Sequence, residues 1–233
     1  MRDTFNTGKT YDLAYRKKQL SQLILGLEEM KDELCDSLYK DLKREHFVSF
    51  LYEISGVSGQ AKYDMNNFEA WTKPSARDTP LTLAPAKSRV IYQPLGNVCI
   101  MGAWNFPITT LFMPLISAIS AGNVALLKPS EMSPNCSASC RKLVETYLDN
   151  ECFKVVEGGA EISIACSQKK WDKICFTGSS EKGKLVAQAA AKNLVPCLLE
   201  LGGKCVTIVD ESADASFAGG KVIAGRLINS GQV

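Results

Sequence analysis

Apolar residues recur at helical spacing through the first seventy residues of the chain. Such spacing places apolar side chains on one face of a helix, where they form core contacts. One stripe lies within 13–38 and comprises Leu20, Leu23, Ile24, Leu27, Met30, Leu34 and Leu38. A second comprises Phe47, Phe50, Leu51, Ile54, Ala61, Met65, Phe68 and Trp71. We therefore expect residues 1–72 to form two long helices that pack on the domain that follows.

A proline-punctuated polar stretch comes next. Pro74, Pro80 and Pro85 interrupt residues 73–88, and proline both lacks a backbone donor and blocks a regular helix. The pattern predicts a connector or an extended arm over residues 73–95, with a role in oligomerisation.

After residue 88, short β-rich runs alternate with longer helical ones. The predicted strands are Arg89–Gln93, Val98–Met101, Val124–Leu127, Phe153–Val156, Ile174–Thr177, Leu198–Leu201 and Val206–Val209. The predicted helices are Thr109–Ala121, Pro134–Leu148, Glu181–Ala191 and Ser216–Ile228. This alternation predicts an α/β fold with a Rossmann-like parallel sheet and flanking helices. Ligands bind such sheets at the carboxyl ends of the strands, so the corners that follow strands are candidate sites.

Composition narrows the class of protein. The 233 residues are 45% hydrophobic and 22% charged, as in ordinary globular domains. The 27 basic and 25 acidic residues are spread without a basic block, so we expect no nucleic-acid partner. No apolar run reaches the roughly 20 residues of a membrane helix. Nine cysteines without CxxC spacing indicate reduced thiols and a cytoplasmic location.

Two further counts bear on the chemistry. Cys136 and Cys140 stand four apart. A structural role is favoured, with metal binding as the open alternative, because two ligands are an incomplete zinc set; we expect no metal. His46 is the single histidine, so a Ser-His-Asp or Cys-His site would have to use it. Its charged surroundings favour a solvated position instead.

The first two corners carry polar groups directly after strands. In Gly102–Pro107, Asn105 could direct its amide at a developing oxyanion, or it could simply satisfy the backbone of a turn. In the second corner Lys128 and Glu131 could hold the hydroxyls of a ribose. The same corner could also, or instead, serve the fold: Ser130 or Ser133 would cap a helix that begins at Pro134, with Glu131 near its positive end.

The remaining corners combine small residues with a carboxylate. Gly178, Ser179 and Gly183 lie at a strand-to-helix turn, without G-x-G-x-x-G spacing, where backbone N–H groups could bind a pyrophosphate. Glu200 ends an apolar run and precedes Gly202 and Gly203. Apolar surroundings would raise the pKa of the Glu200 carboxyl toward neutrality, as suits a general base.

In their order along the chain, the four corners resemble motifs of the aldehyde dehydrogenase superfamily. The motifs are Gly102-Ala103-Trp104-Asn105-Phe106-Pro107, Leu127-Lys128-Pro129-Ser130-Glu131, Phe176-Thr177-Gly178-Ser179 and Glu200-Leu201-Gly202-Gly203-Lys204. The short region before the first strands and the Trp-Asn-aromatic-Pro form are most similar to the class 3 branch, which includes fatty aldehyde dehydrogenases. The resemblance runs from about residue 10 to the last residue.

This resemblance implies NAD(P)-dependent oxidation of a small-molecule aldehyde to a carboxylic acid. Asn105 would stabilise the oxyanion, and Glu200 would activate the thiol or the hydrolytic water. The residues implied in cofactor binding are Trp104, Lys128, Ser130, Glu131, Gly178, Ser179, Gly183, Leu201 and Gly202. Since Glu131 would repel a 2′-phosphate, NAD is favoured, although NADP is possible.

The resemblance also implies where the nucleophile belongs. In the family a cysteine follows a Gly-Gln-x triplet, which Gly231-Gln232-Val233 supplies. We expect the nucleophile one residue past Val233, with Cys205 a poor substitute. Residues 96–200 would then be the dinucleotide-binding domain and 201–233 the start of a catalytic domain. We expect the chain to be an N-terminal portion of a homodimeric enzyme and to be inactive by itself. A C-terminal membrane segment of that enzyme is possible. The alternative is a non-catalytic dinucleotide-binding or interaction module.

Overall fold

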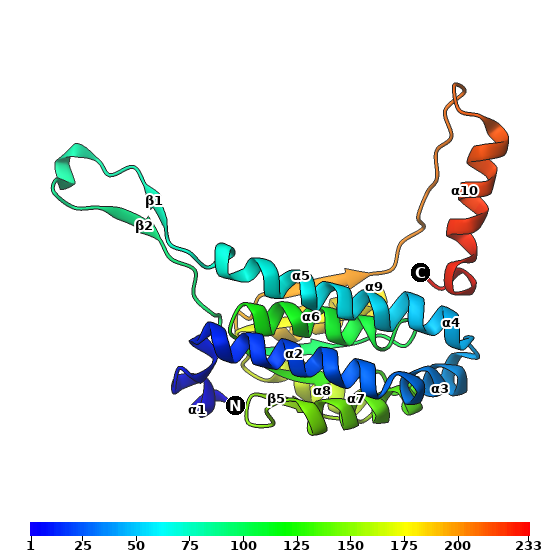
Figure 1. Ribbon diagram of the computed structural model, residues 1–233, viewed down its shortest axis with the longest axis horizontal. Helices are drawn as coiled ribbons and strands as arrows, with labels where there is room; N and C mark the ends of the chain where they lie inside the picture. The colour runs from blue at the N-terminus through cyan, green and yellow to red at the C-terminus, as the bar shows by residue number, and fades with distance from the viewer.

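A five-stranded parallel sheet forms the centre of the computed structural model, which describes residues 1–233 (Figure 1). The strands stand in the order β5-β4-β3-β6-β7. They are β3 (Asn97–Met101), β4 (Val124–Lys128), β5 (Phe153–Val155), β6 (Lys173–Gly178) and β7 (Cys197–Leu201). The chain thus builds from the middle to one edge and then returns to the other side. The order reverses between β3 and β6, the place where open α/β sheets bind ligands.

Helices cover both faces of this sheet, as the alternating pattern predicts. The connecting helices are α6 (Thr109–Ser120), α7 (Pro134–Tyr147), α8 (Ala160–Gln168) and α9 (Ser180–Ala191), of which α8 was not predicted. The N-terminal region contains α1 (Arg2–Asn6), a 3-10 turn (Lys9–Tyr11), α2 (Leu13–Glu29), α3 (Lys31–Leu42), α4 (His46–Ser49), a π-helical segment (Phe50–Ile54) and α5 (Ser55–Trp71). The first stripe is therefore divided between two helices, while the second continues through three contiguous segments.

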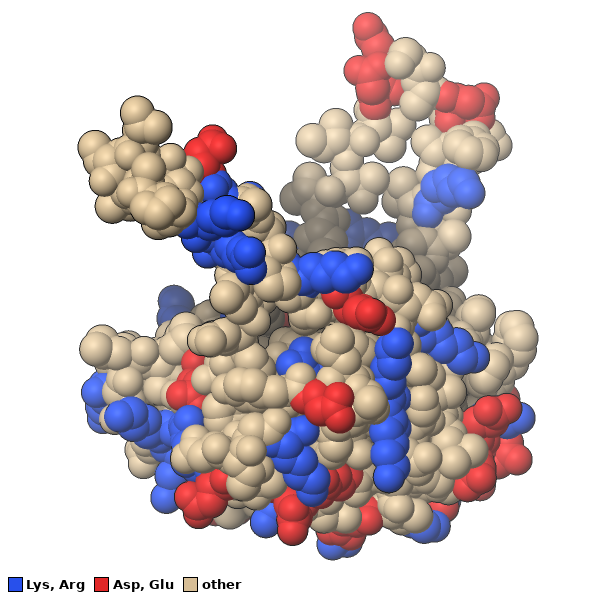
Figure 2. All heavy atoms as spheres, turned by 60° about the vertical axis from the view of Figure 1, so that its left-hand side comes forward, with Lys and Arg blue, Asp and Glu red and all other residues tan.

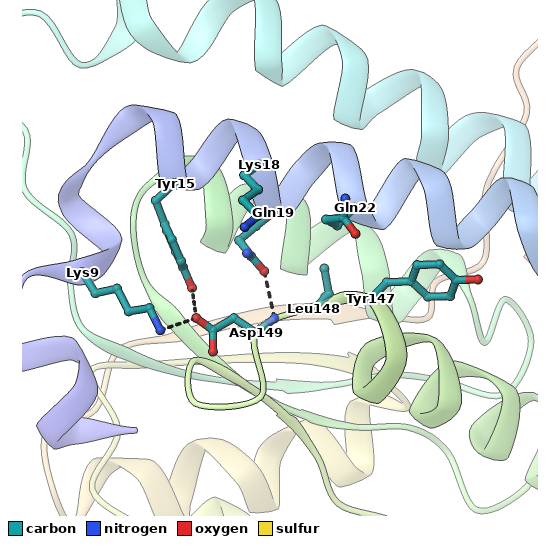
Figure 3. A pocket seen from close by; sticks show the side chains of 8 residues that line it. All are labelled: Lys9, Tyr15, Lys18, Gln19, Gln22, Tyr147, Leu148 and Asp149. Carbon is teal, nitrogen blue, oxygen red and sulfur yellow. Dashed lines mark hydrogen bonds and ion pairs between the residues drawn. The ribbon is translucent and has the colours of Figure 1, made fainter.

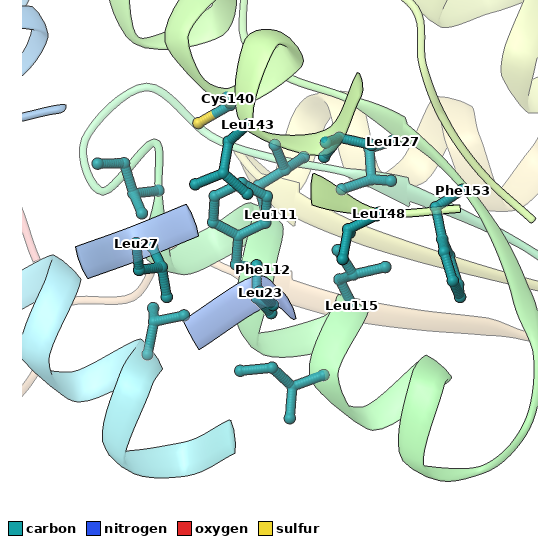
Figure 4. Packing of buried hydrophobic residues seen from close by; sticks show 14 of the residues in the cluster. Leu23, Leu27, Leu111, Phe112, Leu115, Leu127, Cys140, Leu143, Leu148 and Phe153 are labelled. Atoms are coloured by element: carbon teal, nitrogen blue, oxygen red, sulfur yellow. The ribbon is translucent and has the colours of Figure 1, made fainter. Parts of the chain in front are cut away.

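The hydrophobic core is divided unequally by the sheet. One cluster of 30 buried residues fills the side of α2, α3, α5, α6 and α7, and Figure 4 shows Leu23, Phe112 and Leu143 interlocking there. The other cluster has seven buried residues beneath α8 and α9. Alternation along β3 explains the division, since Val98 and Ile100 belong to the larger cluster and Cys99 and Met101 to the smaller.

The predicted stripes meet this core to different extents. Leu20, Leu23, Leu27, Leu34 and Leu38 are buried as predicted. In the second stripe Ile54, Ala61 and Phe68 are buried, but Phe47, Phe50, Leu51 and Trp71 are exposed. The interpretation of these four as core contacts is wrong, because their side of α4, the π-helical segment and α5 faces away from the elements that pack on these segments.

Residues 73–95 leave the body as an arm. Strands β1 (Ser75–Arg77) and β2 (Ser88–Val90) pair antiparallel and carry a 3-10 turn (Leu81–Leu83) at the tip (Figure 1). Residues 79–86 contain no charged side chain. Figure 2 shows this uncharged tip projecting beyond the lysine and arginine side chains that lie nearer the body of the protein. The strand predicted at Arg89–Gln93 is present but ends at Val90.

The segment after β7 departs from the sheet. Val206–Val209 was predicted as a strand, and that prediction is wrong: the segment is extended, pairs with no strand and is exposed. A β-prone sequence forms a ladder only beside a partner, and this segment leads away to the projecting helix α10 (Ala215–Leu227) (Figure 1). A last 3-10 segment (Ile228–Gly231) follows it. None of the helices combines the length and apolar character needed to cross a membrane.

The helix start at Pro134 differs in its cap. Pro134 occupies the first turn as predicted, but neither predicted serine caps the helix with its side chain. The Asp41 carboxylate from α3 accepts instead from the backbone N–H of Asn135 at 3.3 Å and of Cys136 at 2.8 Å. Cys136 and Cys140 are fully buried in the core, as a structural role requires. His46 lies at the surface beside Asp36, with 2.9 Å between Nε2 and Oδ1.

Candidate functional site

All four predicted corners lie at the carboxyl edge of the one sheet. Met101 of β3 is in register with Lys128 of β4 on one side and with Phe176 of β6 on the other. In turn Thr177 of β6 pairs with Glu200 of β7. The strand ends therefore form a row, and the corners that follow them open on the same side.

The second corner presents a cation paired with a carboxylate. Lys128 is buried and its ammonium contacts the half-exposed carboxylate of Glu131. Partial burial raises the pKa of the Glu131 carboxyl, but the hydrogen bond from Lys128, the backbone N–H of Glu131 itself and the charge of Lys128 together outweigh it and leave the pKa below its ordinary value. Ser130 is buried, and its hydroxyl accepts from the Met132 N–H at 3.3 Å, which shapes the turn. The pair offers an acceptor and a donor to vicinal hydroxyl groups.

The third corner is a helix start with little side-chain bulk. The Ser179 hydroxyl accepts from the Lys182 N–H at 3.3 Å and caps α9. A Cβ added at Gly183 would lie 2.6 Å from a methyl of Leu201, and one at Gly178 would lie 2.7 Å from the ring of Phe176. The first N–H groups of a helix have no partner within it, so this glycine-lined start fits a pyrophosphate.

Glu200 occupies different surroundings from those predicted. Its side chain is exposed on β7, an edge strand, and Leu198 and Leu201 are each 41% exposed beside it. The apolar environment expected around Glu200 is therefore absent, because no element of residues 1–233 covers this end of β7. The carboxyl of Glu200 is therefore not buried among apolar side chains. Gly202 and Gly203, which follow, have open space around them.

The first corner meets the last residues of the chain. The side-chain amide of Asn105 donates to the backbone carbonyl of Gln232 at 2.9 Å. The backbone carbonyl of Asn105 accepts from Arg44 at 2.7 Å and from the Asn229 amide at 2.9 Å. Trp104 is half-buried in the same loop. Two segments predicted to act together, the Asn105 loop and the Gly-Gln-Val triplet, are thus in direct contact.

Sequence reasoning missed the residues that support this loop. Arg44 and Glu53 form a buried ion pair, and the second oxygen of Glu53 accepts from the N–H groups of Ile108 at 2.8 Å and Thr109 at 3.0 Å. Burial raises the pKa of the Glu53 carboxyl against the lowering effect of Arg44 and these two N–H groups. The sequence signal that could have indicated Glu53 was its position as an acidic residue within the apolar stripe of residues 47–71.

Two hollows lie elsewhere. One of about 450 Å³ lies at the amino end of β5, where the Asp149 carboxylate is 2.6 Å from the Lys9 ammonium and accepts from the Tyr15 hydroxyl at 3.0 Å (Figure 3). These bonds join the chain before and within α2 to the turn after α7. A groove of about 350 Å³ includes Cys205 and Val233. Cys205 is the one exposed thiol among nine free cysteines.

Comparison with known proteins gives a consistent result. The family model described as the aldehyde dehydrogenase family matches residues 1–233. Aldehyde dehydrogenase family 3 member F1 of Arabidopsis thaliana is 42% identical over 229 residues, which are 95% of this chain and 47% of that protein. The 4,4'-diaponeurosporen-aldehyde dehydrogenase of Staphylococcus aureus is 38% identical, over 98% of this chain and 50% of its own length.

Solved structures agree with the sequence comparison. The substrate-bound state of Staphylococcus aureus AldH superposes with a TM-score of 0.96 at 38% identity, over all of this chain and 51% of that one. This chain spans about half the length of the curated relatives it matches. The match of the family model over residues 1–233, together with these identities, shows that the chain belongs to the aldehyde dehydrogenase family.

Proposed function

We propose that this chain supplies the dinucleotide site and part of the catalytic machinery of an NAD(P)-dependent aldehyde dehydrogenase, which oxidises aldehydes to carboxylic acids. The observation that carries the proposal is the 2.9 Å hydrogen bond between the Asn105 amide and the Gln232 carbonyl. It brings an oxyanion donor to the triplet after which the family places its thiol nucleophile.

The chemistry assigns each polar group a separate task. Asn105 would donate its amide N–H to the oxygen of the attacked aldehyde, a contribution worth about 3 kcal/mol in comparable sites. Glu200 would take a proton from the thiol or from the hydrolytic water. Glu200 is exposed in residues 1–233. This role therefore requires further apolar surface that covers β7, since desolvation is what raises a carboxyl pKa toward neutrality.

The carboxyl edge of the sheet fits a dinucleotide. Lys128 and Glu131 would hold the adenine ribose, and the N–H groups at Ser179 and Ser180 would bind the pyrophosphate. Gly183 and Leu201 set the packing of that helix start, while Trp104, Ser130, Gly178 and Gly202 shape the neighbouring turns. When bound, the nicotinamide would accept the hydride. The Glu131 carboxylate disfavours a 2′-phosphate, so we propose NAD, with NADP as a weaker ligand.

Titration with NADH, followed by its fluorescence, tests the proposal. Saturable binding is expected, with weaker binding of NADPH. Wild-type protein that binds neither cofactor would overturn it. A variant with Glu161→Gln, an exposed carboxylate on α8, serves as a control that should bind as the wild type does.

We also propose that the arm, residues 73–95, joins two copies in a homodimer. Leu81 is 91% exposed and Leu83 57% exposed at its uncharged tip, and apolar side chains gathered at a projection favour a partner surface. A double variant, Leu81→Asp with Leu83→Asp, should sediment as a monomer under conditions in which the wild type is a dimer. Dimerisation unchanged by both substitutions would contradict the role of the arm.

A further inference from the structure

The buried ion pair Arg44–Glu53 is the starting point. The Arg44 side chain is 5% exposed and that of Glu53 is fully buried. Taking such charges out of water is unfavourable for each ion, so a retained pair must be well partnered. Glu53 meets this requirement, since one oxygen faces Arg44 and the other accepts two N–H groups at the start of α6.

Arg44 also contacts two other segments. One nitrogen, Nη2, donates to the Asn105 carbonyl at 2.7 Å and to the Asn229 side-chain oxygen. The guanidinium also lies 5.0 Å from the ring centre of Phe106. A planar guanidinium with several fixed donors can bridge acceptors in this way, which an ammonium cannot reproduce. One side chain therefore joins the π-helical segment, the Asn105 loop and the last turn.

That last turn has an unusual backbone. Asn229, Ser230 and Gly231 have φ values of 49°, 57° and 79°. For residues with a side chain the left-handed conformation is unfavourable, for serine more than for asparagine, and it persists where the surroundings hold it. Asn229 is held from both ends, because its side-chain oxygen accepts from Arg44 and its amide donates to the carbonyls of Asn105 and Gln232.

We propose that Arg44 and Glu53 are positioning residues, which clamp the left-handed turn 229–231 against the Asn105 loop and thereby fix the Asn105 amide relative to Gln232. The chemical meaning of this clamp, alignment of an oxyanion donor, rests on the proposed function. Glu53 binds the N–H groups at the start of α6, Arg44 joins Glu53 to the Asn105 loop, and Asn229 accepts a hydrogen bond from Arg44 in the last turn.

The test is a spectroscopic signature of the Asn105 amide. In ¹⁵N-labelled protein the side-chain NH₂ signals of Asn105 are assigned by their loss in Asn105→Asp. Arg44→Lys keeps a positive charge beside Glu53 but loses the bridging geometry. We expect the Asn105 and Asn229 NH₂ signals to shift and their ¹⁵N relaxation to report greater mobility, while the thermal midpoint stays near that of the wild type.

Two further variants keep the result decisive. Asn229→Ala removes the contacts of the last turn with Arg44 and Asn105 and leaves the buried Arg44–Glu53 pair intact. The Asn105 signals should therefore change in the same direction as in Arg44→Lys, and this variant still gives the result if Arg44→Lys folds poorly. Arg141→Lys, on a surface pair with Glu157 at 2.7 Å, is the matched control and should leave them unchanged. Asn105 signals that are the same in Arg44→Lys, Asn229→Ala and wild type would overturn the proposal.

NADH titration of the same samples separates the two hypotheses. None of the hydrogen bonds of the clamp involves Lys128 or Glu131, so NADH affinity should be the same in Arg44→Lys and wild type. Wild type that binds no NADH would defeat the proposed function while leaving the comparison of amide signals valid. Normal NADH binding with unchanged amide signals would defeat the clamp alone.

Discussion

Gly183 of α9 lies directly beneath Leu201 at the end of β7, where an added Cβ would stand 2.6 Å from a leucine methyl. The helix start that would bind the pyrophosphate is thus packed against the strand that carries Glu200. A residue without a side chain allows this close approach.

Gly183→Val should therefore weaken both packing and cofactor binding. Valine must push aside Leu201, whose side chain is 41% exposed, so the cost lies at the low end of the about 1–3 kcal/mol of core overpacking, and displacement of the first turn of α9 should lower NADH affinity. Gly59→Ala is the matched control, since nothing lies within 4 Å of its added Cβ, and helix propensity predicts a gain of roughly 0.5–1 kcal/mol. Urea unfolding and NADH titration measure both effects, and equal NADH affinity in Gly183→Val and wild type would be contrary to this assignment.

Glu131→Gln should change the preference between cofactors. Loss of a charged acceptor to the ribose hydroxyls is expected to weaken NADH binding by about 1.5–3 kcal/mol. NADPH should lose less, because the repulsion of its 2′-phosphate disappears as well. The ratio of the two dissociation constants, from fluorescence titrations, should move toward unity; an unchanged ratio would remove Glu131 from the ribose site.

The network around Asp149 predicts a pH dependence of stability. Partial burial raises the pKa of the Asp149 carboxyl, but hydrogen bonds from Lys9, the Glu151 N–H and Tyr15 prevail and lower it below its ordinary 3.8. A carboxyl with a lowered folded-state pKa stabilises the fold above its unfolded pKa and loses that contribution as the pH falls through the folded value.

Asp149→Asn should consequently destabilise the protein at neutral pH by about 1–3 kcal/mol, and the deficit should shrink below pH 3.8. Urea unfolding of variant and wild type at pH 7 and pH 3 measures it. Asp32→Asn, with a side chain that is 87% exposed, should show no such pattern. A deficit that is equal at both pH values would rule out the ionised carboxylate as its source.

Phe112→Ala should be among the most damaging core changes. Its ring is fully buried in the larger cluster (Figure 4), and removal of a buried phenylalanine costs about 3–5 kcal/mol. Leu185→Ala on α9, where the side chain is 55% exposed, should cost little. Chemical unfolding that ranks the two variants equally would contradict the assigned core.

The 233-residue chain should form no NADH from NAD and a medium-chain aldehyde. Six of its cysteines are buried, two are half-buried, and the exposed Cys205 lies after Glu200 in a segment without a strand partner. Absorbance at the NADH band measures turnover. Activity that disappears in Cys205→Ala would assign the nucleophile to that thiol and refute this prediction.

How far the sequence predicts this structure depends on the separation of the interacting residues. The strand ends and their corners were predicted because each is encoded locally, as in the β-prone run before Lys128 or the serine-capped turn at Ser179. Arg44, Glu53 and Asp41 were missed because, apart from the contact between Arg44 and Glu53 themselves, their partners lie far along the chain, up to 185 positions away for Arg44 and Asn229.

Glu200 illustrates the opposite failure. Its neighbours are apolar in sequence, but apolar neighbours along a strand do not bury a side chain unless another layer covers that face. The roles of Asn105, Glu200 and the cofactor residues stay predictions.

Because the sheet divides the core unequally, the elements on its two sides should differ in how readily they open to solvent. Opening free energies within one protein follow the local density of buried contacts. Amide hydrogens of α8, α9 and β7, which rest on the cluster of seven residues, should exchange with solvent well before those of α2 and α6, which rest on the cluster of thirty. The half of the sheet that carries the corner at Gly178 and Gly183 should thus open more readily, and a dinucleotide bound there as proposed would have its largest effect on exchange in that half.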